Sequence, residues 1–463
     1  MKHQQVTILG AGPAGLSSAH HLVSRGILPM VLEQAPAVGG ISRTLQYGEY
    51  RYDLGGHRFF TRLSEIAQLW QDLMGDDFLT VSRQSRILYQ GRFMDYPLHL
   101  PNVIAGLGLG ESFLCLLSYL HSRVQPNGDP ETLKGWISNR FGKRLFQKFF
   151  ESYSEKVWGR SCREIRSHWS AQRIRTLSFH KALFDALFQT EGSKSLVREF
   201  HYPVKGAGMM WERLKDRVIE GKGHLHLSSK ALRLEWTGNR VCGLVFEQDG
   251  ERFHASLDHL ISSIPLVDLL RILDPPAPKP VLEAAEALSF RAFIMVLLVL
   301  DKKDLFSDQW IYVHDPDVRV GRIQNFKQWS PFMVPDLDRT SLGMEYFCDP
   351  GDDFFNMEDQ DLKILAMREL VQLGFITERD VLDGTVARVA KAYPIYDMDY
   401  DRHLGVIRSF LNTIDNLQTI GRNGMHAYNN MDLAMHSGIL AAKNVLGESH
   451  DLWGLIEQEK YLE

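Results

Sequence analysis

The first forty residues change their hydrophobic period twice. The apolar run Val6-Thr7-Ile8-Leu9 has the length of a short buried strand, and a segment with helix spacing follows from about Ala14 to Ser24. A second short apolar run, Met30-Val31-Leu32, comes after Gly26. The order strand, glycine-rich turn, helix, strand predicts a βαβ unit, which is typical of a parallel sheet.

The rest of the chain separates into helical and strand-rich stretches. Apolar residues on either side of Gln90-Gly91 predict a hairpin, and helix spacing dominates from about Pro101 to Phe200. Strand segments then return, and a last strand at Leu417 to Ile420 precedes a helix from about Asp432 to Leu446. We expect an α/β fold: a Rossmann-like domain with a helical insertion and a mixed or antiparallel sheet in the substrate domain.

Two apolar stretches raise the question of a membrane segment. The stretch Phe293 to Leu300 is too short to span a bilayer and is typical of a buried strand. The stretch Val103 to Leu120 is longer, but Glu111 and several glycines interrupt it. It predicts a buried or partly exposed helix, with peripheral membrane contact as the alternative, and we expect no transmembrane segment.

The composition is that of a soluble globular protein. The chain has 463 residues, a length that predicts two or three lobes. Its residues are 44% hydrophobic and 24% charged, which is typical of a globular protein. The net charge is -5, and acidic and basic residues are mixed along the chain. A nucleic-acid surface would show clustered Lys and Arg residues, so we expect no nucleic-acid partner. The four cysteines lack the spacing of a metal site and are expected to be reduced thiols, and no signal peptide precedes the first strand, so we expect a cytoplasmic protein.

The turn after the first strand carries a dinucleotide-binding fingerprint, Gly10-Ala11-Gly12-Pro13-Ala14-Gly15. Gly10 permits the tight turn, Gly12 lets the backbone approach a pyrophosphate, and Gly15 lets helix and strand pack closely. Glu33 ends the second strand, where a carboxylate binds ribose hydroxyls. The expected cofactor contacts here are Gly10, Gly12, Pro13, Ala14, Gly15, Glu33 and the adjacent Gln34.

This fingerprint alone does not separate NAD from FAD, but three later segments do. They are Gly39-Gly40-Ile41-Ser42-Arg43 followed by Asp53 to His57, the strand and turn Leu260 to Pro265, and Gly421 to Gly424. In this order the segments resemble the glutathione-reductase-like FAD superfamily, especially its branch of amine oxidases, protoporphyrinogen oxidases and sugar mutases. The resemblance implies FAD, with further contacts from Gly40, Ile41, Ser42, Gly56, His57, Gly421, Arg422, Asn430 and Met431.

A second motif narrows this branch. The run Tyr153-Ser154-Glu155-Lys156-Val157-Trp158-Gly159-Arg160-Ser161 resembles the Tyr-Thr-Glu-Lys-x-Trp-Gly-Arg-Ser run of bacterial UDP-galactopyranose mutases. The resemblance implies that Tyr153 stacks on a uracil base, with Trp158 nearby. An aromatic face can provide about 1–3 kcal/mol to base binding. Without the resemblance, both rings would be interpreted as core aromatics.

The resemblance extends, with gaps, along most of the chain. It implies that Arg173 in a mobile loop, Arg322, Tyr393 and Tyr428 contact the substrate diphosphate, and that Glu345 lies in the sugar pocket. Arginine forks bind phosphate oxygens in pairs, and phenols add neutral donors. The substrate contacts so implied are Tyr153, Trp158, Arg173, Arg322, Glu345, Tyr393, Arg422 and Tyr428, and the catalytic set is Arg173, Arg322, His57, Tyr393 and Tyr428.

The sequence also departs from the mutase pattern. The mutases have His-x-x-His after the glycine pair, whereas this chain reads His57-Arg58-Phe59-Phe60. A family Asp-Met pair reads Asn430-Met431 here, and the chain is longer than the usual bacterial mutase. These changes lie close to the expected positions of the flavin and the sugar. The resemblance therefore extends to a nucleotide diphosphate, and it does not specify the sugar or the reaction.

Two functions fit these residues. The resemblance implies an isomerase of polysaccharide biosynthesis, a flavin-dependent mutase that interconverts pyranose and furanose forms of a nucleotide-diphosphate sugar, with UDP-hexose favoured. It would act through an adduct between the sugar and N5 of reduced FAD. The alternative is an FAD-dependent oxidoreductase of the amine oxidase, protoporphyrinogen oxidase or desaturase type, which removes hydride from an amine, alcohol or CH–CH unit. A non-catalytic flavin-binding module ranks last.

The expected domains are discontinuous. We predict an FAD-binding domain at 1–80, 205–275 and 415–463, a helical substrate-binding lobe at 100–200, and a sheet-containing substrate domain at 81–99 and 281–414. The run Pro275 to Pro280 is interpreted as a linker. The expected partner is a small-molecule substrate. A homo-oligomer, with a surface contact through the helical lobe, is compatible with the sequence.

Overall fold

The computed structural model describes residues 4–96, 106–126, 128–167 and 198–457. Within these ranges the strands form three larger sheets and two short ribbons. The architecture is the mixed α/β fold expected from the sequence, with one parallel sheet and antiparallel or mixed sheets beside it.

The parallel sheet takes its strands from distant parts of the chain, in the order β20-β13-β1-β2-β9. Successive residues of a strand point to opposite faces, so both faces are buried. Ile8 and Val31 belong to one hydrophobic core, and their neighbours Leu9 and Leu32 belong to another. The strands are β1 (Val6–Leu9), β2 (Met30–Leu32), β9 (His224–His226), β13 (His259–Ser262) and β20 (Leu417–Thr419).

Helices cover the face of this sheet that includes Ile8. They are α1 (Pro13–Val23), α2 (Ser64–Met74), α10 (Gly208–Glu220) and α17 (Met431–Val445). Helix α17 approaches α1 closely because Gly438 has no side chain, and a Cβ atom there would collide with the carbonyl oxygen of Ala14. This contact packs the first turn of α1 against the middle of α17.

A second sheet and three helices cover the opposite face, which includes Leu9. The sheet has the order β12-β11-β10-β14, with β10 (Ser229–Thr237), β11 (Arg240–Gln248), β12 (Glu251–Ser256) and β14 (Leu273–Asp274). The helices are α11 (Leu266–Arg271), α12 (Lys279–Ala287) and α15 (Tyr400–Leu411). The interpretation of Pro275 to Pro280 as a linker was therefore incomplete, because Pro278 is the N-cap of α12 and Pro280 lies in its first turn.

The seven-stranded sheet has the order β19-β15-β18-β17-β16-β6-β7. Its strand β15 (Phe290–Leu300) is buried along its whole length, as the apolar run predicted. Alternate residues again serve two cores, with Met295 on the side of the parallel sheet and Ile294 on the side of α14 (Asp359–Gln372). The other strands are β6 (Ser85–Tyr89), β7 (Arg92–Asp95), β16 (Trp310–Val313), β17 (Arg322–Asn325), β18 (Thr340–Cys348) and β19 (Val381–Pro394).

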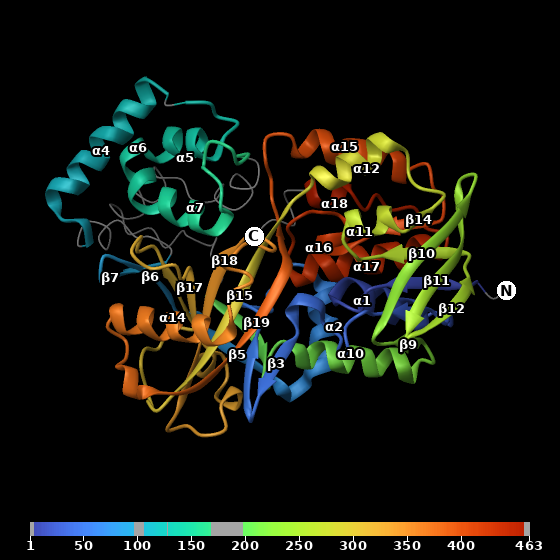
Figure 1. Ribbon diagram of the computed structural model, residues 1–463, viewed down its shortest axis with the longest axis horizontal. Coiled ribbons are helices and arrows are strands. Elements are labelled where there is room, and N and C mark those ends of the chain that lie inside the picture. The colour runs from blue at the N-terminus through green and yellow to red at the C-terminus, as the bar shows by residue number, and fades with distance from the viewer. Residues whose placement is uncertain (1–3, 97–105, 127, 168–197, 458–463) are drawn as a thin grey trace.

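Strands β6 and β7 form the hairpin predicted at Gln90-Gly91. Above them in Figure 1 lies a group of helices whose core includes Ile137, Phe146 and Phe149. It comprises α4 (Leu109–Val124), α5 (Leu133–Phe141), α6 (Lys143–Leu145), a π-helical turn (Phe146–Glu151) and α7 (Ser152–Trp158). No helix among the described residues is long and apolar enough to cross a membrane.

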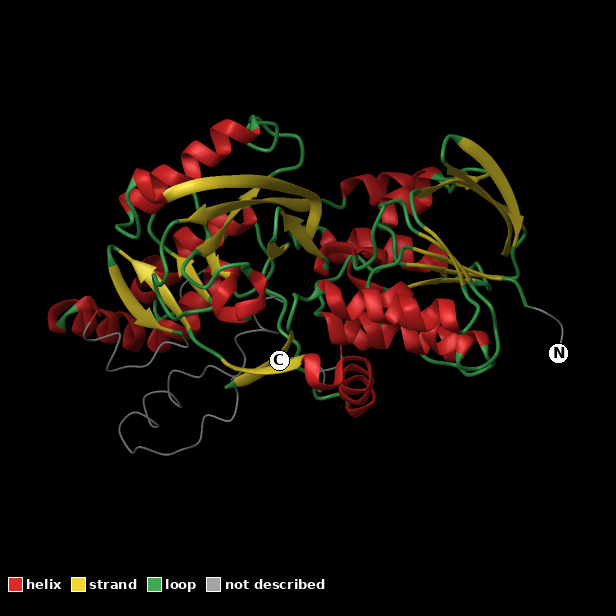
Figure 2. Cartoon of the chain, turned by 90° about the horizontal axis from the view of Figure 1, so that it is seen from below, coloured by secondary structure: helices red, strands yellow, loops and turns green. Residues whose placement is uncertain are grey.

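The two halves of the molecule are seen clearly from two sides. In Figure 1 the helices α4 to α7 and the seven-stranded sheet occupy one half, while α1, α10, α17 and the β10 to β12 sheet occupy the other. In Figure 2 long curved strands fill one half, and a layer of helices lies beside short strands in the other. The long strands β15 and β19 run toward the region where the halves meet.

A buried carboxylate ties two short ribbons to the helix layer. Asp53 accepts hydrogen bonds from the hydroxyls of Thr44 (2.5 Å) and Tyr202 (2.7 Å) and from the backbone N–H of Ala207 (3.3 Å). Burial raises the pKa of Asp53 to about 6. The ribbons are β3 (Thr44–Tyr47) with β4 (Tyr50–Asp53), and β5 (Phe78–Ser82) with β8 (Glu199–Pro203).

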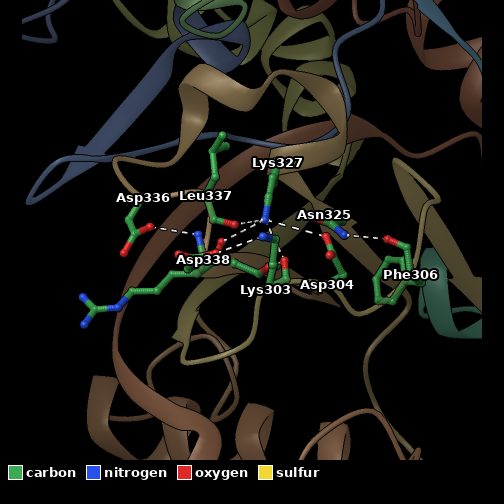
Figure 3. A network of polar contacts seen from close by, with 10 residues as sticks. Lys303, Asp304, Phe306, Asn325, Lys327, Asp336, Leu337 and Asp338 are labelled. Carbon is green, nitrogen blue, oxygen red and sulfur yellow. Dashed lines mark hydrogen bonds and ion pairs between the residues drawn. The ribbon is translucent and has the colours of Figure 1, made fainter.

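A partly buried lysine fixes the loops beyond β17. Figure 3 shows the amino group of Lys327, in α13 (Phe326–Trp329), directed at the carbonyl oxygens of Lys303 and Leu337. The Lys303 hydrogen bond is 2.6 Å, and the Asp304 carboxylate lies 3.8 Å away. Asn325 Nδ2 donates to the carbonyl of Phe306 (3.0 Å), so the end of β17 is held to the same loops.

All four cysteines are free thiols, as expected. Cys115, Cys162 and Cys348 are buried, and Cys242 is exposed.

Candidate functional site

The glycine-rich turn between β1 and α1 forms an open cradle. Gly10 adopts a φ of +95° and donates its N–H to the carbonyl of Leu32 at 2.8 Å. A Cβ atom on Gly15 would collide with the carbonyl of Gly10, so only glycine lets α1 start directly against β1. At Gly12, by contrast, a Cβ atom would meet only the backbone of Gly40, at 3.8 Å. Helix α1 begins here without a side-chain cap, so its first N–H groups can bind a phosphate.

Glu33 lies beside this cradle in a fixed position. Its carboxylate accepts hydrogen bonds from the backbone N–H groups of Ala11 (2.7 Å) and Ala35 (2.8 Å). The side chain is half-buried, whereas that of Gln34 is exposed. A carboxylate at this point of a βαβ unit suits ribose hydroxyls.

Two further segments meet at the same edge of the sheet. Gly39, which precedes the 3₁₀ turn Gly40–Ser42, donates its N–H to the carbonyl of Ala11 at 2.9 Å. Gly421 has a φ of +71°, and a Cβ atom there would lie 2.9 Å from the Cβ of Ala14. Helix α17 starts after Asn430, and its first turn, which includes the buried Met431, has no side-chain cap. These segments are held next to one another, and two uncapped helix N-termini suit a diphosphate and a polar ring edge.

The segment Gly55 to His57 connects the cradle with the seven-stranded sheet. A Cβ atom on Gly56 would lie 3.1 Å from Nε2 of Gln324 and 3.2 Å from the ring of Trp329. The Nδ1 atom of His57 is buried and has no hydrogen-bond partner within the described structure. Burial, with the nearby Arg422 and Arg322, lowers the pKa of His57 to about 3, so its imidazole is neutral at physiological pH.

A row of three side chains crosses the seven-stranded sheet at this point. Arg322 on β17 is paired in register with Tyr312 on β16 and with Glu345 on β18. The Arg322 guanidinium binds the fully buried Glu345 carboxylate at 2.7 Å. Gln324 Nε2 donates to the other carboxylate oxygen at 2.7 Å. Burial alone would lower the pKa of Arg322, but Glu345 and neighbouring tyrosines raise it well above its ordinary value.

A second arginine and two tyrosines complete this side of the site. The rings of Tyr393 and Tyr428 are nearly parallel, with centroids 6.1 Å apart. The guanidinium of Arg422 lies 4.5 Å from the ring centre of Tyr428 and 5.6 Å from that of Tyr393. It also donates to the carbonyls of Asn429 (2.7 Å) and Ala392 (3.2 Å), which hold it in place. Burial raises the pKa of Tyr393, so its phenol is a neutral donor.

Tyr153 approaches the same row from the first turn of α7. Its ring stacks on that of His314, with centroids 4.3 Å apart and planes 9° apart, and meets Tyr312 edge-on at 5.9 Å. One face of Tyr153 is therefore covered by His314. Trp158 is only 3% exposed and packs in the core of the helical lobe. Its position is that of a packing residue.

Two cations fix α7 against the sheet. The amino group of Lys156 donates to the carbonyls of Val313 (3.3 Å), Asp315 (2.8 Å) and Val320 (3.1 Å), and burial lowers its pKa to about 8. Arg291 on β15 donates to the carbonyl of Val157 at 3.0 Å, at the C-terminal end of the helix. A cation at this end is favourable because the helix carbonyls point toward it.

Three residues of this group, Tyr312, Gln324 and His314, were not predicted from the sequence. Gln324 had a signal, because it lies two positions after Arg322 and so shares its face of the strand. Tyr312 and His314 become neighbours only through the pairing of β16 with β17 and the packing of α7.

Most of the substrate residues expected from the sequence lie close together. The contacts above connect Tyr153, Arg322, Glu345, Tyr393, Arg422 and Tyr428, and His57 lies beside them. Arg173 lies outside the described residues. Phe60, which replaces a mutase histidine, packs against the large hydrophobic core, and Asp432 accepts a hydrogen bond from Thr61 at 2.9 Å.

Comparison with known families identifies the family to which the chain belongs. A family model for flavin-containing amine oxidoreductases matches residues 13–446. The chain belongs to this family. The protein is thus a flavoenzyme, and its cofactor is FAD, which the cradle residues fit.

The proteins to which the chain is similar have names that indicate different reactions. The chain is 25% identical to a 15-cis-phytoene desaturase of Synechococcus elongatus over 408 residues, which are 80% of each chain. It superposes on reduced UDP-galactopyranose mutase with a TM-score of 0.83, 19% identity, and coverage of 99% of this chain and 98% of the mutase. It is also similar to a provisionally assigned protoporphyrinogen oxidase from Exiguobacterium sp. 255-15 (TM-score 0.73, 17% identity, 96% and 98% covered). At these identities the solved structures show a shared fold.

Proposed function

We propose that the protein is a flavin-dependent mutase that interconverts pyranose and furanose forms of a nucleotide-diphosphate sugar, with a UDP-hexose as the simplest substrate. The observation that carries the proposal is the polar lining of the site. Arg322 and Arg422 lie with Tyr153, Tyr393 and Tyr428 beside His57. This set of groups is complementary to a base linked to a diphosphate.

The charge of the site also favours an anion. The hydrogen bonds of Arg322 to Glu345 and Tyr393 use Nε and Nη2, so the donors of Nη1 can bind a phosphate oxygen. Tyr393 is a neutral donor next to it, and His57 adds no charge. Glu345 can accept hydrogen bonds from sugar hydroxyls while it balances Arg322.

Each residue then has a role in the proposed reaction. Reduced FAD, when bound, supplies the nucleophile for the anomeric carbon. Arg322, Tyr393 and Tyr428 hold the diphosphate as it leaves and keep it in place for its return. Tyr153 stacks on the base through the ring face that His314 does not cover. We expect Arg173 to add a second clamp on the diphosphate.

An oxidoreductase is the second candidate, because the family model and the desaturase relative both favour it. An amine substrate would place its cation against the parallel rings of Tyr393 and Tyr428. Arg422 already lies against both rings, so a second cation there is disfavoured. A hydrocarbon substrate could not accept hydrogen bonds from Nη1 of Arg322, and covering these donors without a partner would be costly.

Titration with UDP tests the proposal. Wild-type protein should bind UDP, and Arg322→Ala should weaken binding at least tenfold, because one charge-assisted contact is worth about 1.5–3 kcal/mol. Arg233→Ala is the control, because Arg233 is exposed on β10 and, among the described residues, its ion pairs are with Glu235 and Asp274. Equal UDP affinity in wild type and Arg322→Ala would contradict the proposal that the site binds a nucleotide diphosphate.

The reaction itself requires a second experiment. Dithionite-reduced enzyme is incubated with a panel of nucleotide sugars, and the products are separated and identified. Ring-isomerised sugar, formed without net flavin oxidation, supports the mutase. Anaerobic reduction of oxidised flavin by an amine, alcohol or alkane-chain substrate would instead establish the oxidoreductase.

A further inference from the structure

The loop 314–320 connects β16 with β17 and has a residue of the site at each end. His314, at its start, stacks on Tyr153 with ring centroids 4.3 Å apart. Arg322, two residues after its end, binds the buried Glu345 carboxylate at 2.7 Å. In the proposed function one end of this β16–β17 loop supports the ring that stacks on the base, and the other end leads to an arginine that binds the diphosphate. The path of the loop therefore sets the distance between these two contacts.

Lys156 binds carbonyl groups of the β16–β17 loop and its flanking strand end. It is half-buried on α7, three residues after Tyr153, so the two side chains occupy neighbouring positions on one face of the helix. Its amino group donates to the carbonyls of Val313 (3.3 Å), Asp315 (2.8 Å) and Val320 (3.1 Å). An ammonium group has three N–H donors, and these three carbonyls account for all of them. Any effect of Lys156 on a ligand is therefore indirect.

Glu369 binds N–H groups of the same loop. It lies on α14 and is 4% exposed. Its carboxylate accepts hydrogen bonds from the backbone N–H groups of Arg319 (2.5 Å) and Val320 (3.0 Å) and from the hydroxyl of Tyr346 (3.0 Å). Val320 thus has its N–H on a buried carboxylate and its carbonyl on an ammonium group. Because hydrogen bonds to charged groups are the strong ones, the backbone is fixed two residues before Arg322.

We propose that Lys156 is a positioning residue for the nucleotide, because its bonds to the β16–β17 loop fix the spacing between the Tyr153 ring and Arg322. The inference rests on the proposed function and adds how the site selects a base linked to a diphosphate. A ligand that reaches both contacts gains affinity when the spacing is correct, since its second half binds at a high effective concentration. Uridine or pyrophosphate alone reaches one contact and gains nothing from the spacing.

A lysine with the same kind of hydrogen bonds, but outside the site, provides the control. Lys327 directs its amino group at the carbonyls of Lys303 (2.6 Å), Leu337 and Arg339 (3.4 Å), and its side chain is 10% exposed (Figure 3). The loops that it binds contain none of the residues proposed to contact the nucleotide. Its loss therefore removes bonds to three backbone carbonyls without altering the β16–β17 loop.

Titration of the FAD-bound protein with UDP, uridine and pyrophosphate tests the proposal. Lys156→Met keeps an unbranched side chain and removes the ammonium group. It should weaken UDP binding by about tenfold or more, while the affinities for uridine and for pyrophosphate change less than about twofold. Lys327→Met should leave all three affinities unchanged. Lys156→Arg keeps a cation for the carbonyls and should bind UDP more tightly than Lys156→Met does. Unchanged flavin absorbance shows that each variant is folded.

Two further measurements make the test independent of a single variant. Glu369→Gln weakens the hold on the N–H groups of the loop and should show the same loss, confined to UDP. Hydrogen exchange followed by mass spectrometry needs no ligand. Peptides that cover residues 314–321 should exchange faster in Lys156→Met than in wild type, and at the wild-type rate in Lys327→Met.

The outcomes separate the inference from the proposed function. A wild type that does not bind UDP contradicts the proposed function, and the inference with it. UDP affinity that is equal in wild type and Lys156→Met, or a loss of affinity that uridine and pyrophosphate share, overturns the positioning role alone. Unchanged hydrogen exchange of residues 314–321 in Lys156→Met also overturns it.

Discussion

Glu345 determines the charge balance of the site although it never reaches solvent. It is fully buried and accepts hydrogen bonds from Arg322 (2.8 Å) and Gln324 (2.7 Å). The sequence pointed to Arg322 and Glu345 separately, through a resemblance to a known family. Their pairing could not be predicted, because it depends on the register of β17 against β18.

Substitution of Glu345 by Gln separates stability from ligand binding. Glu345→Gln leaves the guanidinium of Arg322 without its counter-charge, so the free energy of unfolding should fall by roughly 3 kcal/mol. We place the effect at the lower end for buried pairs because the Arg322 side chain is 18% exposed. The same change frees Arg322 for an anion, so UDP affinity should rise. Chemical denaturation and UDP titration measure the two effects.

The control for Glu345→Gln is Glu286→Gln. Glu286 is 61% exposed and lies 3.7 Å from Arg271, so its loss should change stability by less than about 1 kcal/mol. If Glu345→Gln lowers stability and UDP affinity together, Glu345 binds the ligand directly and does not compete for Arg322.

At the scale of elements, α7 shows what a motif can and cannot predict. The run from Tyr153 to Ser161 stood out in the sequence, but the reason for its glycine did not. Gly159 ends α7 with a φ of +63°, and a Cβ atom there would overlap the guanidinium of Arg291. Arg291 lies on β15, more than a hundred residues later, so no local pattern includes it. The π-helical turn before α7 could not be predicted either, because the sequence pattern was compared with the α-helical period of 3.6 residues.

Two glycine substitutions with the same backbone geometry isolate the Arg291 contact. Gly159 and Gly238 have φ values of +63° and +61°, but a Cβ atom at Gly238 meets nothing within 4 Å. Gly238→Ala should therefore cost only the backbone strain, about 1 kcal/mol. Gly159→Ala should cost clearly more, because Arg291 must move away from the carbonyl of Val157 that it binds. Equal losses in thermal unfolding would mean that the Arg291 contact does not constrain this position.

At the scale of the whole molecule, the parallel sheet was more predictable than the seven-stranded one. Both faces of β1, β2 and β13 contribute to cores, and such strands appear in the sequence as short apolar runs. The first of them, β1, also runs directly into a glycine-rich turn. The seven-stranded sheet pairs β6 with β16 and β15 with β19, and short runs with similar residues do not specify such distant partners. The site lies at this sheet, so its neighbours Tyr312 and Gln324 were found only in the structure.

The cofactor should stabilise the whole molecule, because its cradle joins segments near Gly12, Gly40 and Gly421 that are far apart in the chain. Gly12→Val tests this. The φ of Gly12 is -77°, which valine accepts, and a Cβ atom there meets only Gly40 at 3.8 Å, so the protein without FAD should fold as before. The side chain would occupy the phosphate position and block FAD.

In wild type, FAD at a hundred times its Kd should add about 2.7 kcal/mol to the free energy of unfolding, and in Gly12→Val it should add almost nothing. Circular dichroism and flavin absorbance, recorded with and without added FAD, measure both; a Gly12→Val protein that binds and is stabilised by FAD like wild type would place the diphosphate elsewhere.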